Sequence, residues 1–509
     1  MPESQVRPQP KPRWLLLGAV LASVAFWLAG YLTFETEDAY PGRMALAIAV
    51  LTATCWLSQC LPLAPASLIP LALMPLLGVL PIKQVAPAYA DPILWLFFGG
   101  FVLAMTIQRW NLHRRIALNV IAKVGLRPRR LVLGFMLAGL LLSMWISNTG
   151  TSLMLLPIGM ALIDRVDKSG MMDRETLPRF SVALMLGIAY GCSVGGTATP
   201  IGTGPNLLFM SRYERLEQLG APPITFLNWM VMFVPFAILL SLLIWATLVF
   251  VVHRLPKGTA KAGEVIHEEL REMGRISSAE SRVLILFGIA VLLWVTWRGG
   301  WADLLGLETA AVQFTADATV ALLVAICAFL VPSGGRGSPP LMDWATARQL
   351  PWEILILLGG GIAIADSFNE TGLSAALAEV LRPAVNALSP ILAIAVIVLL
   401  VTFLTEVTSN TATTALMLPL LASMAKATGQ DPRMFMLPAA IAASCAFMLP
   451  IATPPNAVVF SSGRLTMGQM VRTGVLLNFA SVVVITLWAW FWMFPILGVD
   501  LTAAPAWWK

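Results

Sequence analysis

The chain has 509 residues, of which 58% are hydrophobic and only 12% are charged. That balance excludes a soluble globular domain and indicates a protein that lies mostly within a membrane. The net charge of +6 is best explained by basic loops on one side of the membrane, and no nucleic-acid partner is expected. None of the five cysteines has metal-ligand spacing, and no disulfide framework is predicted.

Residues 1–42 are predicted to form a cytoplasmic N-terminus and the first membrane span. The span runs from about Trp14 to Leu32 and follows three basic residues. No clear small-residue cleavage site follows it, which favours a retained anchor over a signal peptide. The next loop, Glu35 to Asp38, is acidic, which agrees with an external position.

Residues 43–254 are predicted to form the first of two inverted repeats. Within it, residues 131–163 contain no charged residue, whereas basic stretches flank them on both sides. A single crossing would place one basic loop outside, against the positive-inside rule. A re-entrant hairpin that enters from the cytoplasm, with the Ser-Asn-Thr motif of residues 147–149 at its tip, keeps both loops inside. Residues 181–211 are predicted to be a broken helix, because a Thr-Pro-Ile-Gly sequence interrupts an apolar stretch.

The second half repeats these features in the same order. Residues 255–280 are a predicted cytoplasmic connector, and residues 281–496 the second inverted repeat. The repeat contains a hairpin at 388–425, entering from outside, with a second Ser-Asn-Thr motif at 409–411. A second broken helix is predicted at 434–460, and residues 497–509 form an external C-terminal tail. Paired interrupted segments of this kind indicate the binding site of a secondary transporter.

Together these elements predict an all-α polytopic membrane protein, an inverted-repeat secondary transporter with about 11 membrane spans plus two re-entrant helical hairpins. With the N-terminus cytoplasmic and the C-terminus external, most of the 33 Lys and Arg residues fall inside. The expected location is the inner (plasma) membrane of a bacterium, surrounded by membrane lipid.

The two hairpins and two broken helices contain Ser, Asn, Thr and Gly where the helices break, and no Lys or Arg lies within the motifs. Free N–H groups at half-helix N-termini suit an anion, and carbonyls at the opposite ends suit a hard cation such as sodium. An anion held there lacks a fixed positive partner. Co-bound cations would supply that charge, and transport of the anion would then be coupled to transport of the cations.

These motifs resemble the divalent anion:sodium symporter family of di- and tricarboxylate and sulfate carriers, over nearly the whole chain. The resemblance implies a homodimer that works by an elevator motion, with sodium ions as co-transported cofactors and a dicarboxylate as substrate. It implies one sodium site at Ser143, Ser147, Asn148 and Gly202, and a second at Thr405, Thr408, Asn410 and Ala452. It implies a substrate site at Asn148, Thr149, Thr203, Asn410, Thr411 and Thr453.

Two positions need separate comment. Gly204 departs from the family pattern, which often has Pro there, as this chain does at Pro454. Glu406 is the single charged residue among residues 388–425, which form the second predicted hairpin. It is interpreted either as a proton-coupling site or as a hydrogen-bonded structural carboxylate near the tip, and the second interpretation is preferred.

The leading functional hypothesis is therefore sodium-coupled symport of small dicarboxylates, such as the four-carbon acids succinate, malate and fumarate, and not an enzymatic activity. The alternative keeps the fold and assigns a sodium-independent dicarboxylate exchanger or a sulfate carrier. An intramembrane hydrolase would need an activated nucleophile with a base in reach, and an anion channel a line of Arg or Lys. The sequence favours neither.

Overall fold

The computed structural model describes residues 40–58, 60–168, 172–256, 263–296, 317–335, 337–374, 388–501 and 503–508, together with positions 18, 20, 23, 24 and 376. The predicted first span, apart from isolated positions, and the acidic loop after it lie outside the described residues. Part of the predicted connector and the last residue of the tail lie outside them as well.

The described residues are helical, and the only extended pairing among them is an isolated bridge between Pro332 and Pro340. The prediction of an all-α membrane protein is confirmed. In the described part of the chain, seven helical segments are long and apolar enough to cross a membrane: Tyr40–Ser58, Ile82–Arg109, Thr176–Ala198, Phe226–Val252, Ser278–Thr296, Trp352–Glu370 and Met467–Leu497. Shorter apolar helices accompany them, and the count of about eleven spans stays a prediction.

The first predicted hairpin consists of α8 (Pro128–Ser143) and α9 (Asn148–Lys168). Proline at the start of α8 needs no backbone donor there. Helix α8 packs closely on α10 (Thr176–Gly195), because a Cβ at Gly191 or Gly195 would lie less than 3 Å from backbone atoms of α8. Helix α10 is buried from Phe180 to Gly195, so the hairpin is held against the centre of the molecule.

The first broken helix follows directly. Helix α10 continues as the short 3₁₀ turn η3 (Gly196–Ala198), the chain then leaves helical geometry, and α11 (Gly204–Gln218) begins after Thr203. Helix α12 (Phe226–Ala246) returns across this region and ends in a π-helical segment, η4 (Thr247–Val252). Its Trp229 donates a hydrogen bond from Nε1 to the Thr197 carbonyl at 3.1 Å, which fixes the break from one side.

The second half is built in the same order. Helices α21 (Pro390–Leu404) and α22 (Asn410–Thr428) form the second hairpin, and α23 (Arg433–Ala442) and α24 (Pro454–Phe460) flank the second break. Helix α25 (Met467–Trp488) then ends in a π-helical segment, η6 (Ala489–Met493), as α12 does. Helix α24 packs against α9 and α10 of the first half, so the two halves interlock at their breaks.

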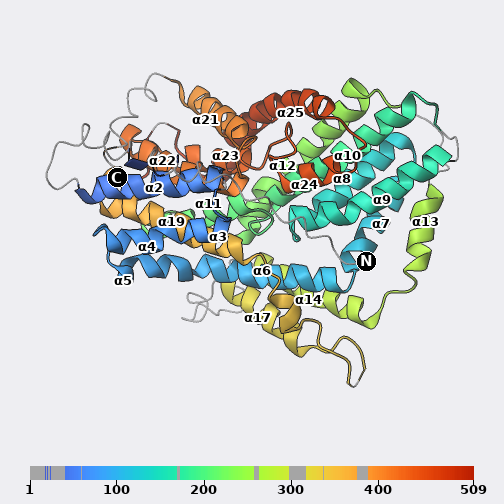
Figure 1. Cartoon of the computed structure of the whole chain (residues 1–509), viewed down its shortest axis with the longest axis horizontal. Helices are drawn as coiled ribbons and strands as arrows, with labels where there is room; N and C mark the ends of the chain where they lie inside the picture. Colours follow the sequence, from blue (N-terminus) through green and yellow to red (C-terminus); the bar gives the residue numbers. More distant parts are fainter. Residues whose placement is uncertain are drawn as a thin grey trace.

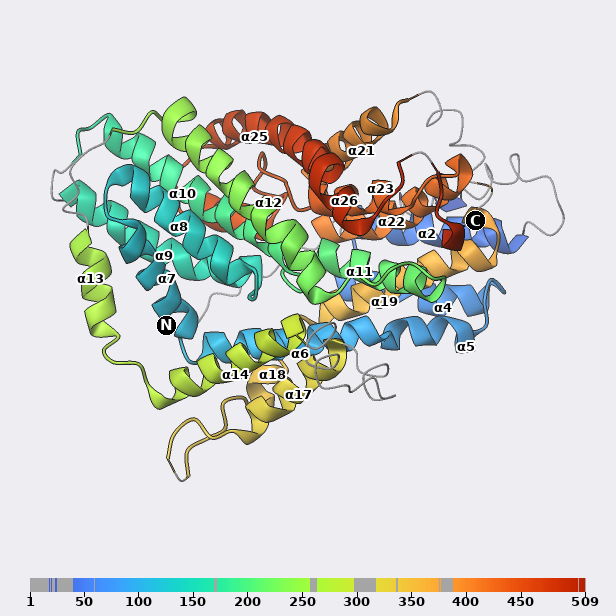
Figure 2. The ribbon, with the colours of Figure 1, turned by 180° about the vertical axis from the view of Figure 1, so that it is seen from behind.

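The remaining helices lie beside this central group (Figures 1 and 2). They include α2 (Tyr40–Ser58), α3 (Leu63–Ser67), α4 (Ile69–Leu76), α5 (Ile82–Val85), η2 (Ala86–Ala90), α6 (Pro92–Arg109), α14 (Ser278–Thr296), α17 (Asp317–Leu330), α18 (Trp344–Ala347) and α19 (Trp352–Glu370). The Gly-Gly pairs of α6 and α19 are close-packing points: a Cβ at Gly99 would overlap Ala321 of α17, and one at Gly360 would overlap the Ser67 carbonyl. Figure 1 shows α8, α9 and α10 on one side of the molecule and α2, α4, α5 and α19 on the other.

The part of the connector that the structure describes forms α13 (Gly263–Glu272), which lies beside α7 (Leu112–Val124) and α9 (Figure 1). Two neighbouring carboxylates hold it there. Glu269 pairs with Arg114 of α7, and Glu268 pairs with Arg165 of α9 at 3.4 Å.

Candidate functional site

The tip of the first hairpin joins a buried hydroxyl to a carboxamide. Ser143, the last residue of α8, donates a hydrogen bond from Oγ to Oδ1 of Asn148, the first residue of α9, at 2.5 Å. Ser143 is fully buried, whereas Asn148 and Thr149 are half-buried. The buried Ser143 hydroxyl therefore holds an Asn148 side chain that is itself partly accessible.

The second tip repeats this arrangement at the same spacing. Thr405 donates from Oγ1 to Oδ1 of Asn410 at 2.7 Å, and the same hydroxyl lies 3.1 Å from the Ala443 carbonyl oxygen. Thr405 is fully buried and Asn410 is half-buried. In both halves the hydroxyl precedes its carboxamide by five residues, so two matching oxygen clusters result.

The two helix breaks are braced by matching asparagines. Asn206 donates from Nδ2 to the carbonyls of Gly196 and Thr199, at 2.9 and 2.8 Å. Asn456 donates from Nδ2 to the carbonyls of Ala446 and Leu449, both at 3.1 Å. Each carboxamide thus donates to two carbonyls at its break, and one of each pair, that of Thr199 or Leu449, also accepts a backbone amide.

The first tip meets the first break at Gly196. A Cβ at Gly196 would lie 2.7 Å from Asn148 Oδ1, and a Cβ at Gly202 would overlap the Gly196 carbonyl. The structure therefore brings together three of the four predicted ligands of the first sodium site, namely Ser143, Asn148 and Gly202. The fourth, Ser147, is exposed at the tip, where its Oγ accepts a hydrogen bond from the Gly150 amide at 3.2 Å.

At the second tip, Thr405 and Asn410 are joined directly, whereas the other two predicted ligands bond to different residues. Ala452 is buried in the loop that Asn456 braces, and its amide donates to the Leu449 carbonyl at 3.2 Å. The Thr408 hydroxyl donates to the Leu404 carbonyl and lies 2.5 Å from the Thr413 hydroxyl. The Thr408 hydroxyl therefore makes its hydrogen bonds within its own hairpin.

The predicted substrate residues come from both halves, and one contact joins the halves directly. Gly204 at the start of α11 lies against Thr411 of the second hairpin, so close that a Cβ at Gly204 would overlap the Thr411 hydroxyl. Thr453 caps α24 by accepting a hydrogen bond at Oγ1 from the Asn456 amide at 3.3 Å. Thr203 occupies the corresponding position before α11, in extended backbone.

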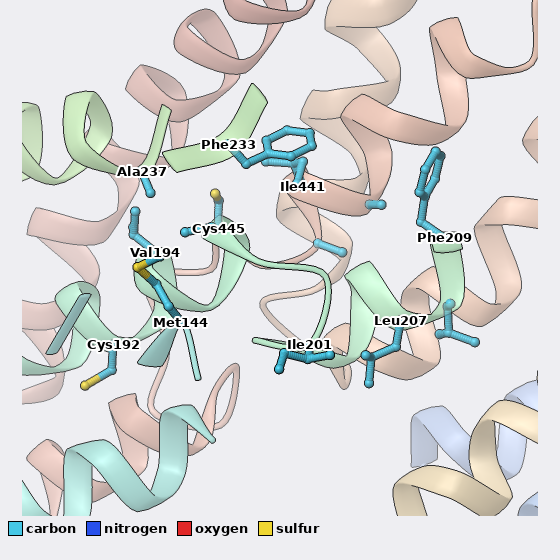
Figure 3. Close-up of a cluster of buried hydrophobic side chains, with 14 of the residues drawn as sticks. Met144, Cys192, Val194, Ile201, Leu207, Phe209, Phe233, Ala237, Ile441 and Cys445 are labelled. Atoms are coloured by element: carbon cyan, nitrogen blue, oxygen red, sulfur yellow. The ribbon is translucent and has the colours of Figure 1, made fainter. Parts of the chain in front are cut away.

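A second link between the halves joins α10 to the second break. Tyr190 of α10 donates from its hydroxyl to the Phe447 carbonyl at 2.7 Å, and the two rings meet edge to face. Apolar side chains enclose this region. Figure 3 shows Met144, Val194, Ile201, Leu207 and other buried side chains from both halves meeting around the broken helices. Polar groups at the breaks are therefore surrounded by a tightly packed apolar wall.

Glu406 accepts hydrogen bonds from four donors. Three are the successive backbone amides of Phe447, Met448 and Leu449, at 2.7, 2.8 and 3.0 Å. The fourth is the Asn478 side chain of α25, at 2.7 Å. This geometry supports the structural interpretation of Glu406, since it ties the second hairpin to the second break.

Three residues that contact these clusters were not predicted from the sequence to take part in the site: Gly196, Thr199 and Asn478. Thr199 donates from Oγ1 to the Met144 carbonyl at 2.5 Å and so ties the first hairpin to the first break. Gly196 and Asn478 stand in apolar sequence without a distinguishing pattern. Only the folded arrangement shows that they matter.

Basic side chains lie farther along α11. Arg215 pairs with Asp366 of α19 at 2.6 Å, and Arg212 approaches the same carboxylate at 3.9 Å. These two arginines line a small pocket with Ala415, Leu418 and Pro419 of α22. They therefore lie beyond the oxygen clusters along α11 and α22, and each is directed toward a carboxylate.

Comparison with known proteins gives three results. The model of the sodium:sulfate symporter transmembrane region matches residues 39–498. The chain is 38% identical over 492 residues to the sodium-dependent dicarboxylate transporter SdcS of Staphylococcus saprophyticus, covering 96% of this chain and 93% of that protein. It is 37% identical to the protein of the same name from Staphylococcus aureus (strain USA300), covering 96% and 92%.

Two solved structures share the fold at low sequence identity. The Alcanivorax borkumensis YdaH transporter superposes with a TM-score of 0.56 at 12% identity, covering 89% of this chain and 98% of that one. Neisseria gonorrhoeae MtrF superposes with a TM-score of 0.54 at 14% identity, covering 94% and 99%. Both likenesses concern the arrangement of helices alone.

Proposed function

Because the chain belongs to the sodium:sulfate symporter family, we propose that it is a secondary transporter that couples the uptake of small dicarboxylates to sodium ions. It is not an enzyme. One observation carries the proposal: each half places a buried hydroxyl against a half-buried carboxamide at a hairpin tip. These groups supply neutral oxygen ligands for sodium, next to N–H donors for a carboxylate.

The substrate class rests on the relatives. Two proteins that cover nearly the whole chain are named sodium-dependent dicarboxylate transporters. Four-carbon acids such as succinate, malate and fumarate are the proposed cargo. Asn148, Thr149, Thr203, Asn410, Thr411 and Thr453 are the proposed contacts for the two carboxylates, and the Gly204–Thr411 contact supports a site shared by both halves.

The cations would neutralise the cargo. Ser143, Ser147, Asn148 and Gly202 would hold one sodium ion, and Thr405, Thr408, Asn410 and Ala452 the second. The nearest described arginines of α11 are paired with Asp366, so a dianion between the tips would depend on sodium for its positive partner. Binding of either species then strengthens binding of the other.

The transport movement and assembly are part of the same proposal. We expect a homodimer in the bacterial plasma membrane, with the N-terminus inside and the C-terminus outside, and two inverted repeats at 43–254 and 281–496. The hairpins at 131–163 and 388–425 and the broken helices at 181–211 and 434–460 would move as one body in an elevator motion. The packing of α24 on α9 and α10 supports a single body that contains both hairpins.

The test is succinate uptake into proteoliposomes. Uptake should collapse when external sodium is replaced by potassium or choline, and uptake that survives the replacement would reject sodium coupling. Because the family model is named for sulfate, sulfate should also be added as a competitor. Weak competition supports a dicarboxylate carrier, whereas competition as strong as that by succinate would reassign the anion. Counterflow against internal succinate distinguishes an exchanger.

A further inference from the structure

In each half, a hydrogen bond joins one residue of the hairpin to one residue of the helix break. The two residues occupy matching positions in the two halves, but the bonding groups differ. Met144 and Glu406 follow the tip hydroxyls Ser143 and Thr405, and Thr199 and Leu449 each precede the bracing asparagine by seven residues. In the first half, the Thr199 hydroxyl donates to the Met144 backbone carbonyl. In the second half, the Leu449 backbone amide donates to the Glu406 side chain.

The two ties differ in charge. The first is made of a hydroxyl and a carbonyl and is neutral. The second contains a carboxylate, and all four of its partners are N–H donors. An ionised carboxylate is purely an acceptor, so this set of donors matches its charged form. The amides and the Asn478 carboxamide are themselves uncharged, and the local net charge therefore remains negative.

Among the residues that the structure describes, no arginine or lysine forms an ion pair with this carboxylate. None of the ion pairs found in the described ranges includes Glu406, whose exposed fraction is 2%. An uncompensated buried charge is costly in an apolar environment. A cation close by would reduce that cost, and Thr405, which directly precedes Glu406, belongs to the oxygen cluster with Asn410 and the Ala443 carbonyl.

We infer that Glu406 is a positioning residue for the second cation site, and that its charge makes this site fill before the first. The inference rests on the proposed function, because it takes sodium as the ion at both tips. The four hydrogen bonds fix the tip next to the break, and the carboxylate adds an attraction that Met144 cannot supply in the first half. The first site should therefore bind sodium more weakly.

The test is sodium binding to the purified protein without substrate, followed by calorimetry. Wild-type protein should bind sodium in a tighter and a weaker step. Glu406→Gln should weaken the tighter step about tenfold or more, because it removes the negative charge of the residue that directly follows Thr405 in a partly buried tip. Asn478→Leu is the comparison variant: it removes one donor to the carboxylate and one acceptor of the Phe447 amide but keeps the charge, and should weaken the tighter step less than Glu406→Gln does.

Two further variants assign the steps to the tips without altering Glu406. Thr405→Ala should weaken the tighter step, and Ser143→Ala the weaker one. The inference is overturned if Glu406→Gln binds sodium like the wild type, if Asn478→Leu loses as much affinity as Glu406→Gln, or if Ser143→Ala alone weakens the tighter step. Should Glu406→Gln fail to fold, the last criterion still decides. Wild-type protein that binds no sodium would instead reject the proposed function itself.

Discussion

Gly204 lies directly against Thr411, at the point where the first half of the chain touches the second hairpin. A Cβ at position 204 would lie 2.9 Å from Thr411 Cγ2 and closer still to its hydroxyl. The corresponding position of the second half is Pro454. The departure from proline at Gly204 thus has a steric cause, because a proline there would collide with Thr411.

Replacing Gly204 by Ala should therefore destabilise the protein by about 1–3 kcal/mol through overpacking and reduce transport sharply. The double variant Gly204→Ala/Thr411→Ala removes the colliding atoms and should recover most of the lost stability. Thermal unfolding of the purified variants measures both effects. Equal melting temperatures for the single variant and the wild type would show that the two segments do not touch.

Replacing Asn148 or Asn410 by Ala should reduce sodium-dependent succinate uptake to background, because each carboxamide is proposed to serve a cation and the substrate. The folded state should survive, since both side chains are half-buried. Ser423→Ala is the control: its hydroxyl bonds only within α22, to the Pro419 carbonyl at 2.9 Å, and uptake should be normal. Normal uptake by either Asn variant would show that the binding residues are misassigned.

Replacing Asn206 or Asn456 by Leu should cost about 1–3 kcal/mol, because each variant removes two buried hydrogen bonds to carbonyls of the break. The two losses should be similar, given that the hydrogen bonds match. Asn119→Leu, at an exposed position of α7, should change the unfolding free energy by no more than about 0.5 kcal/mol. A much smaller effect at one of the two breaks would contradict their equivalence.

His253 follows the last residue of the α12–η4 span, and burial lowers its pKa from 6.5 to about 4, with a smaller contribution from Arg179. The unfolded chain therefore binds a proton between pH 6.5 and 4 that the folded protein does not. Stability should fall as the pH is lowered through that window, by up to about 3 kcal/mol. His253→Gln should flatten this part of the curve of melting temperature against pH.

His113 of α7 contributes in the same direction, since burial also lowers its pKa. The His253→Gln variant should therefore keep a reduced slope, and the double variant with His113→Gln should lose more of it. A slope that is unchanged in the single variant would show that His253 is accessible to protons in the folded protein.

Much of the site could be predicted because it is encoded locally. A hydroxyl five residues before a carboxamide, across a tip of fixed length, brings Ser143 to Asn148 and Thr405 to Asn410. The helix breaks were likewise readable, since Pro and Gly interrupt apolar sequence at both. Charge patterning predicted the first hairpin, because an uncharged segment between two basic loops cannot cross the membrane once without placing one of them outside.

The contacts between segments distant in sequence could not be predicted. The bonds from Thr199 to Met144 and from Tyr190 to Phe447 depend on how α8, α10 and the second break pack together. Asn478 is an isolated polar residue in an apolar helix, and its partner Glu406 lies 72 positions away. No periodicity or local spacing relates such residues. Their pairing follows from the tertiary fold.

The helix α13 has a practical consequence for any measurement of sodium dependence. Its Glu268 and Glu269 hold α9 and α7 through ion pairs whose side chains are substantially exposed, and dissolved salt screens such pairs. Diluting sodium chloride would therefore strengthen these ion pairs at the same time as it empties the proposed cation sites. Titrations at constant ionic strength separate the two effects, and a response that persists there belongs to the sites themselves.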